Sequence, residues 1–359
     1  MSRYHRHIVL DEIGQAGQDK ISKAKVLVVG AGGLGCPALQ YLTAAGIGTI
    51  GIIDFDTVEE SNLQRQILFG TSSIGINKAI AATKRLEDLN PTINSIAYPE
   101  KLTPKNALSL FEGYDIIVDG TDNFSARYLI NDAAILTNKP VVYGAIYKFE
   151  GQVSVFNYQN GPSYRCLFAT PPKEGSVPNC SEIGVLGVLP GIIGTMQANE
   201  VLKMVLGFDT VLSGKLFCFN AMTSETITLK ITKSVAEIEK VRSLREQFSN
   251  QSFASYCKFP VAEISVEEAI KLGNNQFIDV RELGEKPTIE LPNCIQIPLH
   301  TLEHELAQID SEKNKMLFCK TGIRSKTAVE ILQKHNQHNC YSLIGGAETI
   351  LAHQKLELK

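Results

Sequence analysis

The stretch from Val26 to Gly35 constrains the fold of this chain more than any other part of the sequence. Four consecutive aliphatic residues, Val26–Val29, predict a buried parallel strand, and a helical pattern follows the glycines. The G-x-G-x-x-G spacing between them is made by Gly30, Gly32 and Gly35, with Gly33 inside it. Such a loop lets the backbone approach a phosphate, and the helix after it presents free N–H groups. The pattern predicts a nucleotide site in a doubly wound, Rossmann-like α/β domain. A glycine-rich turn that only packs a helix on a sheet has the same pattern.

Composition limits the classes of protein to which the chain can belong. Its 359 residues suggest two domains or one large one, and a net charge of -3 argues against a nucleic-acid binder. The first six residues lack the apolar core of a signal peptide, and the longest uncharged stretch, 183–199, is interrupted by Pro190. Eight cysteines without paired spacing are typical of reduced thiols. We therefore expect a cytoplasmic protein that binds neither nucleic acid nor membrane.

A second predicted strand, Thr49–Asp54, ends in a carboxylate 19 residues after Gly35. In a doubly wound fold this is the position of an acid that binds the ribose of a nucleotide. Asp54 is therefore a candidate ribose ligand. A nicotinamide or flavin dehydrogenase would share the glycine loop and this acid.

The segment after that strand is unusually polar. It contains Asp56 and then, within Ser61–Gln66, the candidates Asn62, Arg65 and Gln66. Arginine forks bind phosphate oxygens and amides can position them, whereas nicotinamide chemistry needs a flat apolar slot. A triphosphate therefore fits this cluster better than a dinucleotide does. The alternative is a solvated loop.

Two further charged residues begin or precede predicted helices. Lys78 begins a helix over Lys78–Leu89, where its charge opposes the helix dipole unless an anion is held nearby. A strand over Asp115–Asp119 leads to Asp122 at the carboxyl end of the sheet. With a triphosphate present, Asp122 is a natural Mg²⁺ ligand. A cap for the helix 124–136, which Asp or Asn would provide, is equally compatible with the sequence.

Taken together, these stretches make the first 230 or so residues resemble the ATP-dependent activators of ubiquitin-like sulfur carriers. The resemblance is to the molybdopterin-synthase and thiamine-pathway adenylyltransferases in particular. The matching stretches are Arg3–Ile8, Gly30–Gly35, Asp54–Asp56, Ser61–Gln66, Lys78, Thr121–Asn123, Gly144–Ala145, Gly151–Gln152, Pro178–Cys180 and Gly184–Gly191.

The resemblance implies roles for the candidate residues. ATP lies on the glycine loop with its ribose at Asp54, and Asp56 and Gln66 belong to the same site. Asn62, Arg65, Lys78 and a Mg²⁺ held by Asp122 surround the phosphates. Arg6 reaches the phosphates of a partner subunit across a homodimer. The terminal Gly-Gly carboxylate of a small carrier protein attacks the α-phosphate to give an acyl-adenylate and pyrophosphate.

The cysteines of this half depart from the family pattern in one respect. Relatives often carry Cys-x-x-Cys twice and bind a structural zinc, but here the first pair reads Ser163-Tyr164-Arg165-Cys166 and a second is missing. We therefore expect no structural zinc, and we interpret Cys166 as a packed thiol. Cys180 matches a cysteine that bonds covalently with the carrier in some members and is dispensable in others, so its role stays open.

A second α/β pattern begins near Phe259, after a polar stretch that we interpret as a linker over 232–257. Here Cys319 ends a predicted strand, and a tight loop runs through Arg324 into a helix over 325–334. Backbone N–H groups and the helix dipole stabilise a thiolate or persulfide in such a loop, and Arg324 adds positive charge. Four residues separate Cys319 from Arg324, one fewer than in cysteine phosphatases, so the loop suits a single sulfur atom. A buried core cysteine is the alternative.

This half resembles a single rhodanese domain over residues 258–359. The matching stretches are Ile278–Glu282, Ile295–Leu299, the cysteine loop and Leu343–Gly346. The region 283–293 is shorter than usual and lacks the acidic-aromatic and Gly-His pattern common there.

The combined interpretation is an adenylyltransferase domain (1–231) followed by the linker (232–257) and a small α/β rhodanese-like sulfurtransferase domain (258–359). ATP activates the carrier, and a persulfide on Cys319 supplies the sulfur of the carrier thiocarboxylate. A donor such as a cysteine desulfurase would load Cys319. The expected carrier is the molybdopterin-synthase small subunit. The alternatives are the thiamine-pathway carrier and a non-catalytic scaffold that binds nucleotide or carrier.

Overall fold

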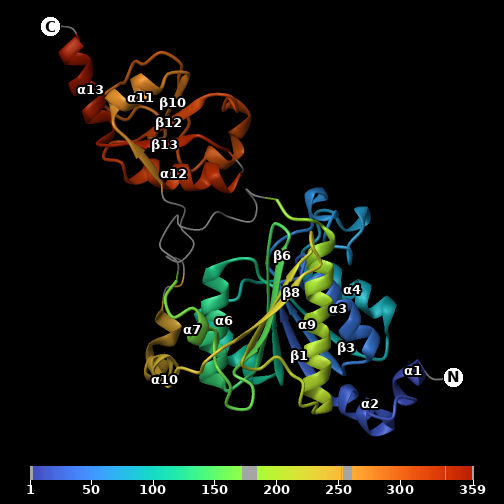
Figure 1. Cartoon of the computed structure of the whole chain (residues 1–359). Coiled ribbons are helices and arrows are strands. Elements are labelled where there is room, and N and C mark those ends of the chain that lie inside the picture. The colour runs from blue at the N-terminus through green and yellow to red at the C-terminus, as the bar shows by residue number, and fades with distance from the viewer. Residues whose placement is uncertain (1–2, 172–183, 252, 254–260, 336, 358–359) are drawn as a thin grey trace. The chain divides into compact units, whose positions relative to one another are not determined.

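The computed structural model describes residues 3–171, 184–251, 253, 261–335 and 337–357. The chain divides into two compact units, Met1–Cys257 and Lys258–Lys359, and we describe each by itself (Figure 1). Each unit is built around its own β-sheet.

The sheet of the first unit has the strand order β3-β2-β1-β4-β5-β6-β7-β8. Strands β1 to β5 pair in parallel, and β6 to β8 continue the sheet with antiparallel pairs. The strands are β1 (Lys25–Val29), β2 (Thr49–Ile53), β3 (Asn94–Tyr98), β4 (Ile116–Asp119), β5 (Val141–Tyr147), β6 (Glu150–Phe156), β7 (Lys215–Asn220) and β8 (Thr226–Lys230). Because the strand order changes direction between β1 and β4, a ligand crevice is expected outside the carboxyl ends of these two strands.

Helices cover both faces of this sheet. The helices are α1 (His5–Ile8), α2 (Gly14–Lys23), α3 (Gly35–Ala45), α4 (Lys78–Leu89), α5 (Pro104–Glu112), α6 (Phe124–Thr137), α7 (Tyr164–Leu167), α9 (Val188–Leu206) and α10 (Val235–Ser243). Short 3₁₀ turns form η1 (Glu60–Asn62), η2 (Thr71–Ser73) and η3 (Arg245–Asn250).

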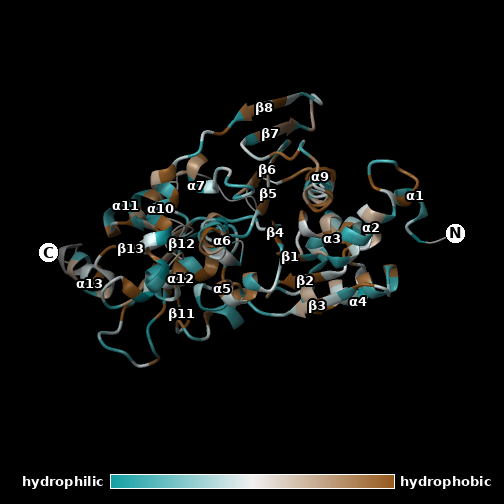
Figure 2. Cartoon of the chain, turned by 90° about the horizontal axis from the view of Figure 1, so that it is seen from below, coloured by the Kyte–Doolittle hydropathy of each residue, from teal (hydrophilic) through white to brown (hydrophobic). Residues whose placement is uncertain are grey.

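Alternation along the central strands produces two separate cores. Val26 and Val28 of β1 pack in a cluster with residues of α3, α4 and α9, whereas Leu27 and Val29 pack with residues of α5 and α6 on the other face. Helix α9, seen end-on and largely brown in Figure 2, is rich in apolar residues and packs against α3 and the strands β5 and β6. Four aliphatic residues in a row are therefore all buried because each face of the strand is covered.

Part of the stretch that we interpreted as a linker packs within the first unit. Helix α10 contacts α6, and Ile238, Val241, Phe248 and Phe253 are buried in the same cluster as the core of that helix. Most of the charged residues that suggested a linker are exposed, whereas Lys233 and Glu237 are partly buried. The compact first unit therefore extends beyond residue 231.

The second unit has a five-stranded, fully parallel sheet of order β11-β10-β12-β13-β9. Its strands are β9 (Ala262–Ile264), β10 (Asn275–Asp279), β11 (Cys294–Gln296), β12 (Asn314–Phe318) and β13 (Cys340–Leu343). Its helices are α11 (Val266–Leu272), α12 (Ile323–Lys334) and α13 (Gly346–Glu357), with 3₁₀ turns η5 (Leu302–His304) and η6 (Leu306–Gln308). Clusters on the two sheet faces again form separate cores.

These two architectures confirm the predicted fold class. Among the described residues, no helix is both long enough and apolar enough to cross a membrane.

Candidate functional site

The glycines of the first loop have different structural tasks. Gly30 has φ +90°, and a Cβ there would lie 3.0 Å from the carbonyl oxygen of Gly120. A Cβ on Gly35 would lie only 2.0 Å from the carbonyl oxygen of Gly30. By contrast, the nearest atom to a Cβ on Gly32 would be 3.9 Å away. Gly30 and Gly35 therefore allow close backbone packing, whereas Gly32 leaves space at the surface of the loop.

Asp54, directly after β2, lies against this loop. Its carboxylate accepts hydrogen bonds from the backbone N–H of Ala31 at 2.8 Å and of Asp56 at 2.9 Å. Burial raises the pKa of Asp54, while these two N–H groups and the Lys78 ammonium act in the opposite direction. The glycine loop and the segment after β2 thus fix the orientation of Asp54, the predicted ribose ligand.

The polar segment after β2 also reaches the loop. Gln66 is 3% exposed, and its amide nitrogen is 4.0 Å from the Cβ position of Gly32. Its side-chain oxygen has no hydrogen-bond partner among the residues that the structure describes. The Cδ of Arg65 is 3.7 Å from the Cβ position of Gly33. Arg65, a predicted phosphate ligand, and Gln66, a predicted member of the same nucleotide site, therefore both lie beside the glycines. Asn62 is buried and caps η1 together with Glu59, which shapes the segment that carries them.

Lys78 is the first residue of α4, as the sequence predicted, and is 7% exposed. Its ammonium lies 3.2 Å from the carboxylate of Asp56. The capping of the helix itself is done by Asn77, whose side chain accepts from the N–H groups of Ala79 and Ile80. Asp56 thus orients the Lys78 ammonium close to Asp54 and the loop.

Asp122 was predicted to be either a Mg²⁺ ligand or the cap of the following helix, and its neighbour Asn123 distinguishes between the two. The Asn123 side chain accepts a hydrogen bond from the N–H of Ala126 at 2.9 Å and caps α6. Asp122 is exposed in the loop after β4, and its carboxylate accepts a long contact, 3.5 Å, from the Asn123 amide. Its carboxylate is therefore not the cap. Within the described part of the chain, no three His, Cys, Asp or Glu side chains cluster as a metal site.

Sequence reasoning missed a buried glutamine beneath this site. Gln197, in α9, is fully buried and donates from its amide to the carbonyl oxygens of Asp119 at 2.7 Å and Val142 at 3.1 Å. Asp119 is the last residue of β4 and Val142 the second residue of β5, so one side chain joins the end of one strand to the beginning of the next. A polar residue inside an otherwise apolar helix was the available signal.

Asp119, the last residue of β4, is a second group that the sequence interpretation left out. Its carboxylate accepts from the N–H and the hydroxyl of Thr121 at 3.0 and 2.7 Å. Burial raises the pKa of Asp119, against the effects of Arg127 and Thr121. The bonds to Thr121 shape the loop that carries Asp122.

Arg6 lies away from the glycine loop of the same chain. It is exposed on α1, next to Tyr4, whose hydroxyl accepts from the Asn90 amide at 2.8 Å at the end of α4. That end of α4 belongs to the amino edge of the parallel strands, opposite the loop. Cys180 lies outside the described residues.

The sulfur of Cys166 is hydrogen-bonded within the first unit. It accepts from the backbone N–H of Ser163 at 3.3 Å and of Ser234 at 3.2 Å. These bonds join the start of α7 to the start of α10. The thiol therefore ties together two segments that are 68 residues apart in sequence.

In the second unit, Cys319 follows β12 and is 1% exposed. Its sulfur accepts from the N–H of Gly322 at 3.1 Å and lies 3.7 Å from the Ser325 hydroxyl, at the start of α12. Burial alone would raise the pKa of this thiol. The backbone and hydroxyl of Ser325, with the N–H groups of Thr321 and Gly322, outweigh burial and lower the pKa. The loop therefore stabilises a sulfur anion, as a nest of N–H groups does.

Arg324 does not present an unpaired charge to this loop. Its guanidinium donates two hydrogen bonds of 2.7 Å to the carboxylate of Glu285. The Arg324 side chain holds the pKa of Glu285 at about 2. The arginine thus fixes the loop after β10 to the start of α12.

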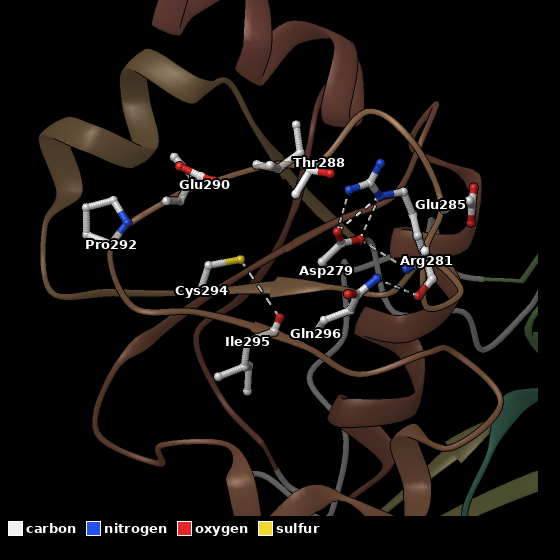
Figure 3. A pocket seen from close by; sticks show the side chains of 12 residues that line it. Asp279, Arg281, Glu285, Thr288, Glu290, Pro292, Cys294, Ile295 and Gln296 are labelled. Carbon is white, nitrogen blue, oxygen red and sulfur yellow. Dashed lines mark hydrogen bonds and ion pairs between the residues drawn. The ribbon is translucent and has the colours of Figure 1, made fainter.

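A cavity of about 580 Å³ lies beside this ion pair, on the β10–β11 side of the sheet. Figure 3 shows Glu285, the Asp279–Arg281 ion pair and the Cys294 thiol around it. Burial raises the pKa of Cys294 to about 11, so this thiol is not poised to ionise near neutrality. The cavity lining includes neither Cys319 nor the glycine loop.

Comparison with known proteins agrees with this geometry. The ThiF family matches residues 4–237, and the Rhodanese-like domain matches residues 264–353. The chain belongs to the ThiF family. Membership implies that it uses ATP, and the sequence-based assignment of both halves is confirmed.

Relatives with both halves carry two activities in their names. "Adenylyltransferase and sulfurtransferase MOCS3" of Xenopus laevis is 39% identical over 92% of this chain and 81% of its own length. "Probable adenylyltransferase/sulfurtransferase MoeZ" of Mycobacterium tuberculosis is 38% identical over 96% and 91%. "Sulfur carrier protein adenylyltransferase" of Thermus thermophilus is 48% identical over 65% of this chain and 88% of its own. The chain is thus an enzyme of the adenylyltransferase and sulfurtransferase class.

Solved structures share the fold of the first half. Escherichia coli MccB crystallised with ATP has a TM-score of 0.57 and 21% identity, over 65% of this chain and 72% of its own.

Proposed function

We propose that this chain adenylylates the C-terminal glycine of a small ubiquitin-like sulfur carrier and converts it to a thiocarboxylate with sulfur carried on Cys319. The observation that supports the proposal most directly is the hydrogen-bonded Cys319 loop, in the same chain as a nucleotide loop lined by Gln66 and Arg65. A sulfur anion held by N–H groups is the nucleophile that an acyl-adenylate requires.

ATP would bind at the carboxyl edge of β1, β2 and β4. The space over Gly32 admits a phosphate, and Asp54 accepts from the ribose hydroxyls. The unpartnered Gln66 oxygen is available to a hydroxyl, N–H or hydrated-ion donor of the ligand. Arg65 and Lys78 neutralise phosphate charge. Asn62 holds the turn that precedes Arg65, and Asp56 orients the Lys78 ammonium.

A Mg²⁺ ion fits this site. Asp122 offers an exposed carboxylate that is not used as a helix cap, and one carboxylate with phosphate oxygens is a usual Mg²⁺ environment. When bound, the ion would supply charge neutralisation on the phosphates.

In the first reaction a carboxylate oxygen of the carrier bonds to the α-phosphorus of ATP. The bond from that phosphorus to its bridging oxygen breaks, and pyrophosphate leaves. Positioning and charge neutralisation suffice for such a displacement, and no protein nucleophile is needed. Arg6 of a partner subunit would complete the phosphate site, which is why we propose a homodimer.

In the second reaction the outer sulfur of a Cys319 persulfide attacks the carbonyl carbon of the adenylate, and AMP leaves. The resulting acyl disulfide is opened by another thiol, for which Cys180 is the candidate within the chain. The thiol bonds to the Cys319 sulfur and releases the carrier thiocarboxylate. An external reductant then restores the two thiols.

The proposed setting is the cytoplasm. The carrier is proposed to be the molybdopterin-synthase small subunit, with the thiamine-pathway carrier as the alternative. A protein persulfide donor such as a cysteine desulfurase would load Cys319. The adenylylating part is proposed to lie within residues 1–231 and the sulfur-transferring part within 258–359.

The test separates the two reactions. In Cys319→Ala, carrier-dependent ATP–pyrophosphate exchange should stay near the wild-type rate, and thiocarboxylate formed from a persulfide donor should disappear. Cys340→Ala is the matched control, since Cys340 is also buried in the second unit but lies away from the loop. Mass spectrometry of the carrier detects the replacement of one oxygen by sulfur. Wild-type thiocarboxylate formation by Cys319→Ala would refute the role of Cys319, and absence of exchange in the wild type would refute adenylylation.

A further inference from the structure

A fully buried serine lies where the second core should be apolar. Ser342, in β13, is 0% exposed, and its register partner in β12 is Leu317. Leu317 and Cys340 belong to the cluster that packs with α12, and Ser342 lies on the same face of its strand as Cys340. A hydroxyl in such a place costs free energy unless it has a hydrogen-bond partner. Its presence therefore calls for a physical explanation.

The partner of that hydroxyl is a second buried serine. The Ser342 Oγ lies 2.9 Å from the Oγ of Ser325, which is also 0% exposed. Ser325 in turn lies 3.1 Å from the carbonyl oxygen of Gly322 and 3.7 Å from the sulfur of Cys319. The three side chains form a row from β13 to the sulfur.

The number of hydroxyl protons limits which hydrogen bonds these side chains can form at the same time. A hydroxyl has one proton to donate, and Ser325 has three acceptors within reach: the Gly322 carbonyl, the Cys319 sulfur and the Ser342 oxygen. When Ser342 donates to Ser325, the Ser325 proton is left for the carbonyl and the sulfur. A hydrogen bond from Ser342 to the Ser325 oxygen polarises the Ser325 hydroxyl and strengthens its donation. When Cys319 is a thiol the direction can reverse, because each serine oxygen also accepts.

We propose that Ser342 is a positioning residue that acts through Ser325 to stabilise the anionic form of the Cys319 sulfur. The inference rests on the proposed role of Cys319 as the sulfur carrier. It adds that a residue 23 positions further along the chain, on another strand, takes part in holding that sulfur.

The charged side chains near Cys319 are paired with other groups or exposed to solvent, so neutral hydrogen-bond donors stabilise the sulfur anion. On α12, Arg324 is paired with Glu285, and on the β10 side Arg281 is paired with Asp279. Lys320, in the loop itself, is exposed to solvent, and Lys326 pairs with Glu263 near β9. The groups that hydrogen-bond the sulfur are all neutral: the Ser325 hydroxyl and the backbone N–H groups of Thr321, Gly322 and Ser325.

The test is the pH profile of Cys319 alkylation in the full chain, without carrier or ATP. Iodoacetamide is the probe, and the modified Cys319 peptide is quantified by mass spectrometry. Ser325→Ala should lower the rate at pH 7 about tenfold and Ser342→Ala about threefold, because hydrogen bonds to a charged sulfur are lost or weakened. In both variants the midpoint should move to higher pH, and the plateau rate at high pH should stay the same.

Two further variants make the result specific. Cys340→Ala, on the same strand and face, should leave the midpoint unchanged. In the Ser325→Ala background, Ser342→Ala should have no additional effect, because it acts through Ser325. An unchanged midpoint in a folded Ser342→Ala would overturn the proposal. So would a rate loss that is equal at every pH, which indicates altered access to the sulfur. Since the assay needs no sulfur donor, its outcome is independent of whether Cys319→Ala abolishes thiocarboxylate formation.

Discussion

Substitution of Gly32 by alanine should separate nucleotide binding from folding. The added Cβ would have no atom closer than 3.9 Å, and Gly32 does not have positive φ, so the folded chain accepts the methyl group. Replacing glycine at a compatible position changes stability by about 0.4–1 kcal/mol in the favourable direction. The same methyl would occupy the space in which we place the ATP phosphates. Overpacking by a methyl group costs about 1–3 kcal/mol, which corresponds to a loss of ATP affinity of about 5- to 150-fold.

Gly35→Ala is the matched control. Its Cβ would lie 2.0 Å from the carbonyl oxygen of Gly30, a backbone atom that cannot move without displacing the loop. This variant should lose stability and ATP binding together. Calorimetric titration with ATP and thermal unfolding of both variants provide the measurements. If folded Gly32→Ala binds ATP with the wild-type Kd, the phosphates do not lie over Gly32 and our placement of the nucleotide is wrong.

Asp122→Ala should abolish pyrophosphate exchange without lowering the unfolding temperature, whereas Asn123→Ala should cost about 1 kcal/mol of stability as a lost helix cap; normal exchange in Asp122→Ala would remove the proposed metal role. Arg65→Ala should likewise lose exchange, and retention of the wild-type rate would exclude a phosphate contact. Protein purified without chelators should contain far less than one zinc per chain by elemental analysis, and a stoichiometric amount would contradict this expectation. The alkylation rate of Cys319 should reach half its plateau below pH 9.0, because the pKa of this thiol is lowered. Cys36 should still react slowly at that pH, because burial raises its pKa to about 12. The opposite order would show that the loop does not stabilise the Cys319 anion.

Features that depend on near neighbours in sequence were predictable. The helix Lys78–Leu89 begins and ends where its pattern indicated, and Cys319 follows its strand directly. In both cases the signal is local, since strand periodicity, helix caps and a glycine loop are properties of a few consecutive residues.

Features that depend on distant partners were not predictable. Arg324 was expected to bring positive charge to Cys319, but Glu285, 39 residues earlier, takes both arms of its guanidinium. The stretch after residue 231 looked like a linker because its charges are easy to see. Four of its apolar residues are buried in a cluster with residues of α5 and α6, which lie about a hundred positions earlier in the sequence. Tertiary contacts decide which cationic side chain is paired with a carboxylate and which weakly apolar segment is buried. No local sequence pattern contains this information. The catalytic roles of the individual site residues stay predictions.

The contact between Gly30 and Gly120 has a consequence for how this chain can vary. Each glycine would place a Cβ within about 3 Å of the other's carbonyl oxygen: 3.0 Å from Gly30 to Gly120 and 2.7 Å in reverse. Replacing either one forces the same two backbones apart. Once they have separated, the second replacement has less contact left to break, so the two costs should not add. The two positions should therefore form a coupled pair, in which the double variant is less destabilised than the sum of the two single variants.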